Sequence, residues 1–74
     1  MKHSEFWRAL EEVHGAGLGR SLAQDLVLAE MGCTAEQALA RGVPPRQVWD
    51  ALCDETDASD SQRWVYREDP RRRP

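Results

Sequence analysis

The segment from Thr34 to Cys53, TAEQALARGVPPRQVWDALC, constrains the fold most, because it contains the start, stop and restart signals of two short helices. Thr34 and Gln37 have the spacing of a capping box, in which each side chain accepts a hydrogen bond from the other residue's backbone N–H. Gly42 provides the positive φ that ends a helix, and one of the prolines that follow can begin the next. The segment therefore predicts two helices that meet at a tight turn.

Apolar residues recur at helical spacing in two further segments. In the first, Ser4 is the predicted N-cap and Gly15 the predicted stop. Glycines 15, 17 and 19 favour a flexible connection, from which helix resumes at a second capping box formed by Ser21 and Gln24, or as early as Leu18. The predicted helices are therefore about residues 5–14, 21–31, 35–41 and 45–55, with Phe6, Leu10, Leu22, Leu26, Ala38, Leu39, Val48, Trp49, Leu52 and Cys53 facing inward.

No segment alternates apolar and polar residues with β-branched enrichment, so no sheet is predicted. The predicted fold class is all-α, a compact bundle of three to four short helices joined by short connections. Residues 1–64 are expected to form a single helical domain, in which 58–64 make one loose turn. Residues 65–74 have little to bury and contain two prolines, so we expect a disordered, arginine-rich tail.

Charge and length exclude several classes of protein. The chain has 74 residues, a net charge of −3 and no CxxC pair, and it lacks a signal-like N-terminus and a run long enough to span a membrane. We therefore expect a cytoplasmic protein with no membrane association. The acidic balance argues against a surface devoted to nucleic acid. The arginines of the tail admit three interpretations: solvated residues, a partner for the acidic stretch 50–60, or a non-specific grip on nucleic acid.

The turn at Gly42 also matches a DNA-binding helix-turn-helix unit, with Ala38 and Val48 at suitable spacings. The second helix presents Arg46 and Gln47 in its first turn, as a recognition helix would. Asp50, Asp54 and Glu55 then follow on the outward side, where phosphate oxygens would repel their carboxylates. Structural packing is therefore the preferred interpretation of this unit.

Other chemical sites are predicted to be absent. The glycines after residue 14 lack the leading strand and the lysine of phosphate-binding loops. His3, His14, Cys33 and Cys53 do not have the paired spacing of structural zinc sites, so no metal and no cofactor is predicted. Cys53 is expected in the core and Cys33 in a loop. No nucleophile and base can be paired, so we expect no enzyme activity.

The strings SEFW, LVLAEMG and EQALARGVPPRQVWDALCDETD are similar to a small actinobacterial family of uncharacterised helical proteins, domain-of-unknown-function family 3046. The resemblance covers about residues 2–64 and is most specific over 38–57. It implies an all-helical fold, and the family's frequent gene neighbourhood near the recombinase and its regulator implies an association with DNA repair. It transfers no catalytic residue.

These observations predict a small non-enzymatic module that binds another protein through its helical surface. Tryptophan and arginine are enriched among residues that dominate binding energy at interfaces. The candidate partner-binding residues are Trp7, Arg46, Gln47 and Asp50. The alternative is a helix-turn-helix-like nucleic-acid-binding or DNA-repair-associated protein that uses residues 34–53 and the tail.

Overall fold

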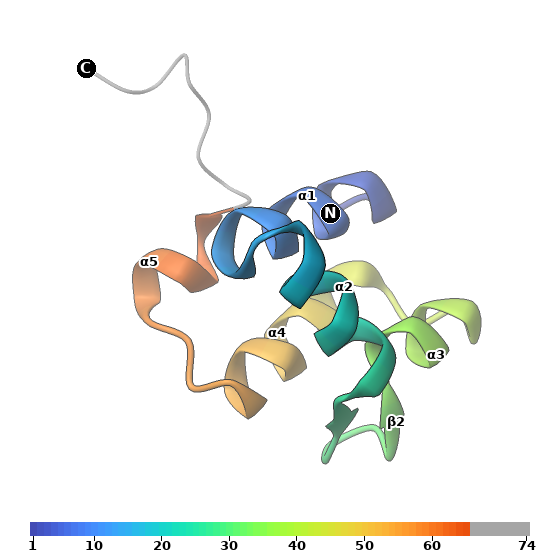
Figure 1. Cartoon of the computed structure of the whole chain (residues 1–74). Coiled ribbons are helices and arrows are strands. Elements are labelled where there is room, and N and C mark those ends of the chain that lie inside the picture. The colour runs from blue at the N-terminus through green and yellow to red at the C-terminus, as the bar shows by residue number, and fades with distance from the viewer. Residues whose placement is uncertain (66–74) are drawn as a thin grey trace.

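Five helices and one pair of short strands make up residues 1–65, the part of the chain that the computed structural model describes (Figure 1). The predicted helical bundle is confirmed. The predicted tail falls outside the described residues except for Val65, which is half-buried against the core. No helix within residues 1–65 has the length and apolar character needed to cross a lipid bilayer. The elements are α1 His3–His14, α2 Ala16–Asp25, β1 Val27–Leu28, β2 Cys33–Thr34, α3 Ala35–Ala40, α4 Pro45–Glu55 and α5 Asp60–Arg63.

Helices α3 and α4 form where the local signals predict them. The Thr34 hydroxyl oxygen accepts a hydrogen bond from the Gln37 backbone N–H at 3.2 Å, and the Gln37 amide oxygen accepts one from the Thr34 N–H at 3.0 Å. Gly42 has a φ of 91°, which L-residues with a Cβ rarely adopt, and the chain turns there. Pro45 is the first residue of α4, where its missing N–H leaves no helical bond unmade.

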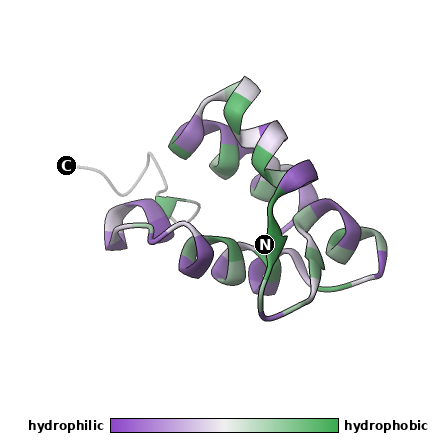
Figure 2. Cartoon of the chain, turned by 60° about the horizontal axis from the view of Figure 1, so that its bottom comes forward, coloured by the Kyte–Doolittle hydropathy of each residue, from purple (hydrophilic) through white to green (hydrophobic). Residues whose placement is uncertain are grey.

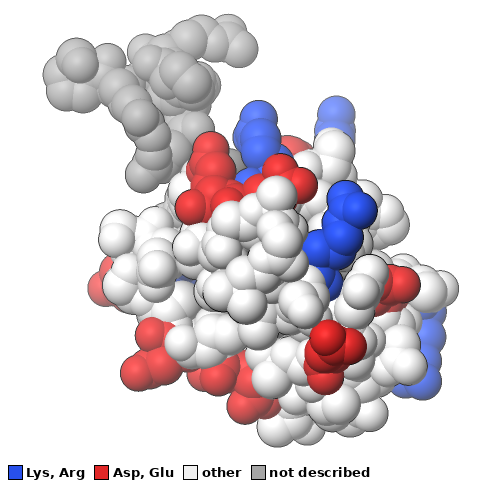
Figure 3. Space-filling view, viewed as in Figure 1, with Lys and Arg blue, Asp and Glu red and all other residues white. Residues whose placement is uncertain are grey.

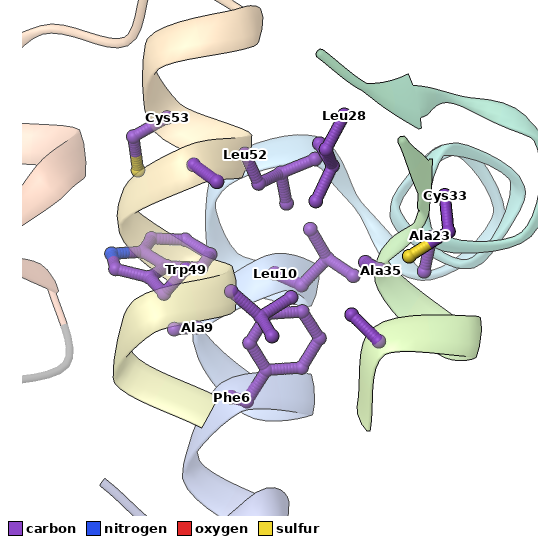
Figure 4. Packing of buried hydrophobic residues seen from close by; sticks show 13 residues of the cluster. Phe6, Ala9, Leu10, Ala23, Leu28, Cys33, Ala35, Trp49, Leu52 and Cys53 are labelled. Atoms are coloured by element: carbon purple, nitrogen blue, oxygen red, sulfur yellow. The ribbon is translucent and has the colours of Figure 1, made fainter. Parts of the chain in front are cut away.

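The core is centred on α4, whose Trp49 is only 1% exposed. The Trp49 ring meets the Phe6 ring of α1 edge to face, with centroids 6.0 Å apart and planes at 88°. Apolar residues recur along one side of the larger helices (Figure 2). In the close-up of Figure 4, side chains from α1, α2, both strands and α3 converge on α4. The buried apolar residues are Phe6, Ala9, Leu10, Ala23, Leu28, Cys33, Ala35, Ala38, Val48, Trp49, Ala51, Leu52 and Cys53.

The short helix α5 covers the other side of Trp49. The indole N–H of Trp49 donates to the Arg63 carbonyl oxygen at 2.8 Å, which satisfies a donor that burial would otherwise leave unpaired. The Arg63 guanidinium also lies 2.7 Å from an Asp54 carboxylate oxygen. Ser59 and Gln62 form a capping box at the start of α5. The segment predicted as a loose turn is therefore a capped helical turn tied to α4.

The connection between the first two helices is shorter than predicted. Gly15, with a φ of 85°, separates α1 from α2, and α2 begins at Ala16 rather than at Ser21. Gly19 is buried in this helix, and a Cβ built on it would lie 3.0 Å from the Leu10 carbonyl oxygen of α1. The glycine therefore permits close packing of two helices and is not part of a flexible loop. The predicted start of α1 is also wrong, because Lys2 and not Ser4 is its N-cap.

The prediction that helix continues to Met31 and that no sheet forms is wrong. The helix ends at Asp25, and Val27 and Leu28 pair antiparallel with Thr34 and Cys33. The N–H groups of Met31 and Gly32 both donate to the Leu28 carbonyl oxygen, which closes the turn between the strands. Leu28 thereby becomes fully buried, whereas the preceding Val27 is 56% exposed.

The two glycines within α2 give a matched test of the α1–α2 contact. Gly17→Ala should raise the free energy of unfolding by about 0.5–1 kcal/mol, because alanine favours helix and a Cβ there meets nothing within 4 Å. Gly19→Ala should instead lower it by about 1 kcal/mol, because overpacking against Leu10 outweighs the same helical gain. Urea denaturation of both variants measures the difference. Equal stabilisation by the two substitutions would contradict the close approach.

Candidate functional site

Trp7 is the predicted partner-binding residue that comes from α1. Its side chain is half-buried and contacts the Phe6 ring edge to face, with centroids 5.3 Å apart. It lines a shallow surface pocket of about 270 Å³ together with Arg20, Gln24 and Glu36, which α2 and α3 contribute. The structure therefore combines Trp7 with three polar residues that the sequence did not single out.

Arg46, Gln47 and Asp50 all lie on α4. Arg46 and Gln47 are exposed in its first turn, and Asp50 follows Arg46 by one turn and is half-buried. None of the three lines the pocket that contains Trp7. The predicted residues thus form two groups, one on α4 and one represented by Trp7 alone.

The carboxylates at the end of α4 already have partners within the fold. Asp54 forms the ion pair with Arg63, and a Glu55 carboxylate oxygen accepts a hydrogen bond from the Ala29 backbone N–H at 2.8 Å. These contacts tie α4 to α5 and to the residue that follows β1. The acidic end of α4 therefore has a structural role, and it places negative charge beside the surface that a helix-turn-helix protein would present to DNA.

The α2 surface holds a mainly apolar depression. Leu18 and Leu22 lie one helical turn apart on α2, and Leu26 follows as the C-cap of this helix, where the backbone becomes extended. These three residues are here called the leucine ridge. With Ser21 and Asp25 they line a groove of about 290 Å³. Leu18 is 58% exposed, and Leu22 and Leu26 are half-buried. The space-filling view shows a broad uncharged area over α1 and α2 with acidic and basic side chains toward its edges (Figure 3).

The leucine ridge is not predicted from the sequence, because its leucines fall in two predicted elements. Leu22 and Leu26 are expected in the core on one helix, and Leu18 lies in the predicted connection or at the earliest start of that helix. The repeat at positions i, i+4 and i+8 was available as a signal for one helix face. Which side of that helix faces outward depends on the packing of Gly19 and Ala23 against the rest of the fold, which the sequence does not reveal.

Residues 1–59 match the family model described as "Protein of unknown function (DUF3046)". The chain belongs to this family. No curated protein and no solved structure is significantly similar to it. The DUF3046 match includes the leucine ridge, Trp7 and the whole of α4, and it ends before α5 begins at Asp60. The cover that α5 provides for Trp49 thus lies beyond the part of the chain that matches DUF3046.

Both cysteines of this DUF3046 protein are free thiols in buried positions. Cys53 lies in the core as predicted, whereas the expectation of a loop position for Cys33 is wrong, because β2 buries it. Burial lowers the pKa of His14, at the end of α1, so the neutral imidazole is favoured there rather than the charged form expected at a helix end. Within residues 1–65 no group of three or more His, Cys, Asp or Glu side chains could hold a metal ion.

The thiol of Cys53 is held in its neutral form. Burial raises its pKa from 9.0 to about 11, and the negative charges of Asp50 and Asp54 add to this effect, while nearby Arg63 opposes it. A thiol that ionises so late is a poor nucleophile near neutral pH. The arrangement around Cys53 is therefore that of a core residue.

The raised pKa of Cys53 predicts a loss of stability in alkali. Its contribution to the free energy of unfolding is fully present below pH 9.0 and is lost as pH rises toward about 11, because the unfolded chain ionises first. Between pH 8 and 10.5 the wild type should lose up to roughly 2 kcal/mol more than Cys53→Ala, whose smaller side chain cannot titrate. Urea denaturation under reducing conditions measures how the free energy of unfolding of each protein depends on pH. An equal pH dependence of the two proteins would contradict the prediction.

Proposed function

We propose that this DUF3046 protein is a small non-enzymatic interaction module that binds another protein through the leucine ridge on α2. The observation that carries the proposal is the exposure of Leu18, at 58%, at the head of a stripe of three leucines. Val27, at 56% exposed, follows directly after the ridge. Single exposed apolar residues are common, but Leu18 lines one groove with Leu22 and Leu26, and adjoining apolar residues on one face are typical of a surface that a partner covers.

A non-enzymatic role is supported by the state of the reactive groups. The two thiols are the strongest nucleophiles of the chain, and both are buried. The depressions on the surface are shallow and small beside the enclosed sites that bind most substrates. We also propose a cytoplasmic location, because the two cysteines are unpaired, as in proteins of reducing compartments.

The residues chosen from the sequence keep a place in this proposal. Arg20 and Gln24, which line the pocket of Trp7, lie on the same helix as the ridge. A partner seated on α2 could therefore also reach Trp7. Arg46, Gln47 and Asp50 remain a separate predicted surface on α4.

Nucleic-acid binding is the second candidate function. It is supported by the α3–α4 unit, in which Gly42 makes the turn and Arg46 and Gln47 are exposed in the first turn of the second helix. Asp50 and Asp54 weigh against it, since they follow on the same helix. A labelled duplex titrated at low and moderate salt, with and without residues 67–74, tests this candidate. Binding that weakens steeply with salt and needs Arg46 would favour it over the interaction module.

A photo-crosslinking residue placed at Val27 tests the interaction module. In cells that naturally produce the chain, we expect a discrete crosslinked protein that Leu18→Glu reduces at least tenfold, because a charge then interrupts the ridge. The same probe at exposed Ala40 of α3, and the variant Ala40→Glu combined with the probe at Val27, serve as controls. Trp7→Ala and Arg46→Ala in the same assay test the residues predicted from the sequence.

A crosslink that persists in Leu18→Glu, or an equal one from position 40, would contradict the proposed surface. Circular dichroism of each variant verifies that the helices remain formed. Leu18 is well suited to this comparison because more than half of its side chain already lies in solvent. Substitution there should change the stability of the fold little.

A further inference from the structure

We infer that the leucine ridge accepts an amphipathic α-helix of a different protein, which places a lysine or arginine opposite Asp25. The inference rests on the proposed function and adds the chemistry of the partner. Its basis is the shape of the ridge, the carboxylate along one edge, and the mismatch between this edge and a second copy of the chain.

The shape of the ridge suits a helix. Leu18 and Leu22 lie one turn apart on α2, and Leu26 is its C-cap, four residues further on. The three leucines line one groove that follows the helix for about 12 Å. Side chains spaced four residues apart pack into the grooves between the corresponding rows of another helix. The ridge leads from an exposed leucine to half-buried ones, so a docked helix would continue the apolar surface of the fold.

Charge determines which helix fits. Ser21 and Asp25 border the ridge on one side, and the Ser21 hydroxyl donates to an Asp25 carboxylate oxygen at 3.4 Å. Asp25 is exposed. The ion pair found within residues 1–65 joins Arg63 to Asp54 and does not involve Asp25. No lysine or arginine lines the groove. A cation on the partner would meet this carboxylate, and the net charge of −3 would favour its approach.

A second copy of the chain fits the ridge poorly. Its own ridge has the same lining, with Asp25 and no cation, so self-association would leave the carboxylates without counter-charges. Stable dimers bury about 1,200–2,000 Å² in total, which is much more than one row of three leucines supplies. The ridge is therefore better matched to a single helix that carries its own complementary charge.

Two model helical peptides of equal length test the inference by NMR titration of the full chain. Both carry leucines at positions i, i+4 and i+7, and they differ only in lysines or glutamates beside this stripe. At low salt we expect the lysine peptide to bind about five times more tightly, from the exchange of one attractive pair for a repulsive one. The resonances of Leu18, Leu22, Leu26 and Asp25 should shift.

Three variants separate the contributions of charge and of the apolar ridge to peptide binding. Asp25→Asn should reduce the preference for the lysine peptide to less than twofold, because it removes the charge and keeps the shape. Leu18→Glu should weaken both peptides at least tenfold, whereas Ala40→Glu, which adds a charge on α3 away from the ridge, should leave the affinities within twofold. Tighter binding of the glutamate peptide, equal binding of both, or shifts confined to other elements would overturn the inference.

The failure of this inference is distinguishable from failure of the proposed function. If the Val27 probe crosslinks a protein in a Leu18-dependent manner while neither peptide binds, the helical partner is wrong and the interaction module stands. If sedimentation shows a dimer that Leu18→Glu dissociates, the occupant is a second copy and the inference is overturned. If neither the probe nor the peptides report contact at the ridge, both proposals fail.

Discussion

Burial of Trp49 is the interaction on which the other elements depend. Its ring makes an edge-to-face contact with Phe6 of α1, and its indole N–H donates to the carbonyl oxygen of the last residue of α5. A tryptophan contributes a large apolar area to a small core, but its N–H must find an acceptor when it is buried. The fold meets both requirements at once, since α5 provides the acceptor and its ion pair with Asp54 holds that acceptor in place.

The elements that could be predicted from the sequence are those whose boundaries are set by adjacent residues. Thr34 and Gln37 bond to each other, and Pro45 fixes its own φ, so the ends of α3 and α4 depend little on the rest of the chain. The predictions for residues 15–33 failed because their signals are ambiguous. Ser21 and Gln24 have capping-box spacing, yet Ser21 lies mid-helix and bonds to the Asp25 side chain. Gly19 serves close packing, which only the position of Leu10 explains.

The candidate site was also predictable only in part, because its arrangement depends on packing between helices rather than on adjacent residues. The helical positions of Trp7, Arg46 and Gln47 could be assigned to the outer side from the sequence. In the structure these residues are indeed accessible at least in part. Their grouping depends on how the helices cross, so the separation of Trp7 from the α4 residues could not be derived. The ridge was missed for a further reason. A leucine stripe usually marks the side of a helix that faces the core, and the small residues Gly19 and Ala23 occupy that side of α2.

The contact at Gly19 also affects how α2 would behave in a complex. Where two helices are separated by long side chains, each can rock as those side chains change rotamer. Here the backbone of α2 sits directly against a carbonyl group of α1, so the helix has little freedom to roll about its axis. Leu18 and Leu22 on its outer side are thus held in a fixed orientation before any ligand arrives, and Leu26 after its end packs against the core. Such preorganisation reduces the entropy lost on association, so even a small contact area can support measurable affinity.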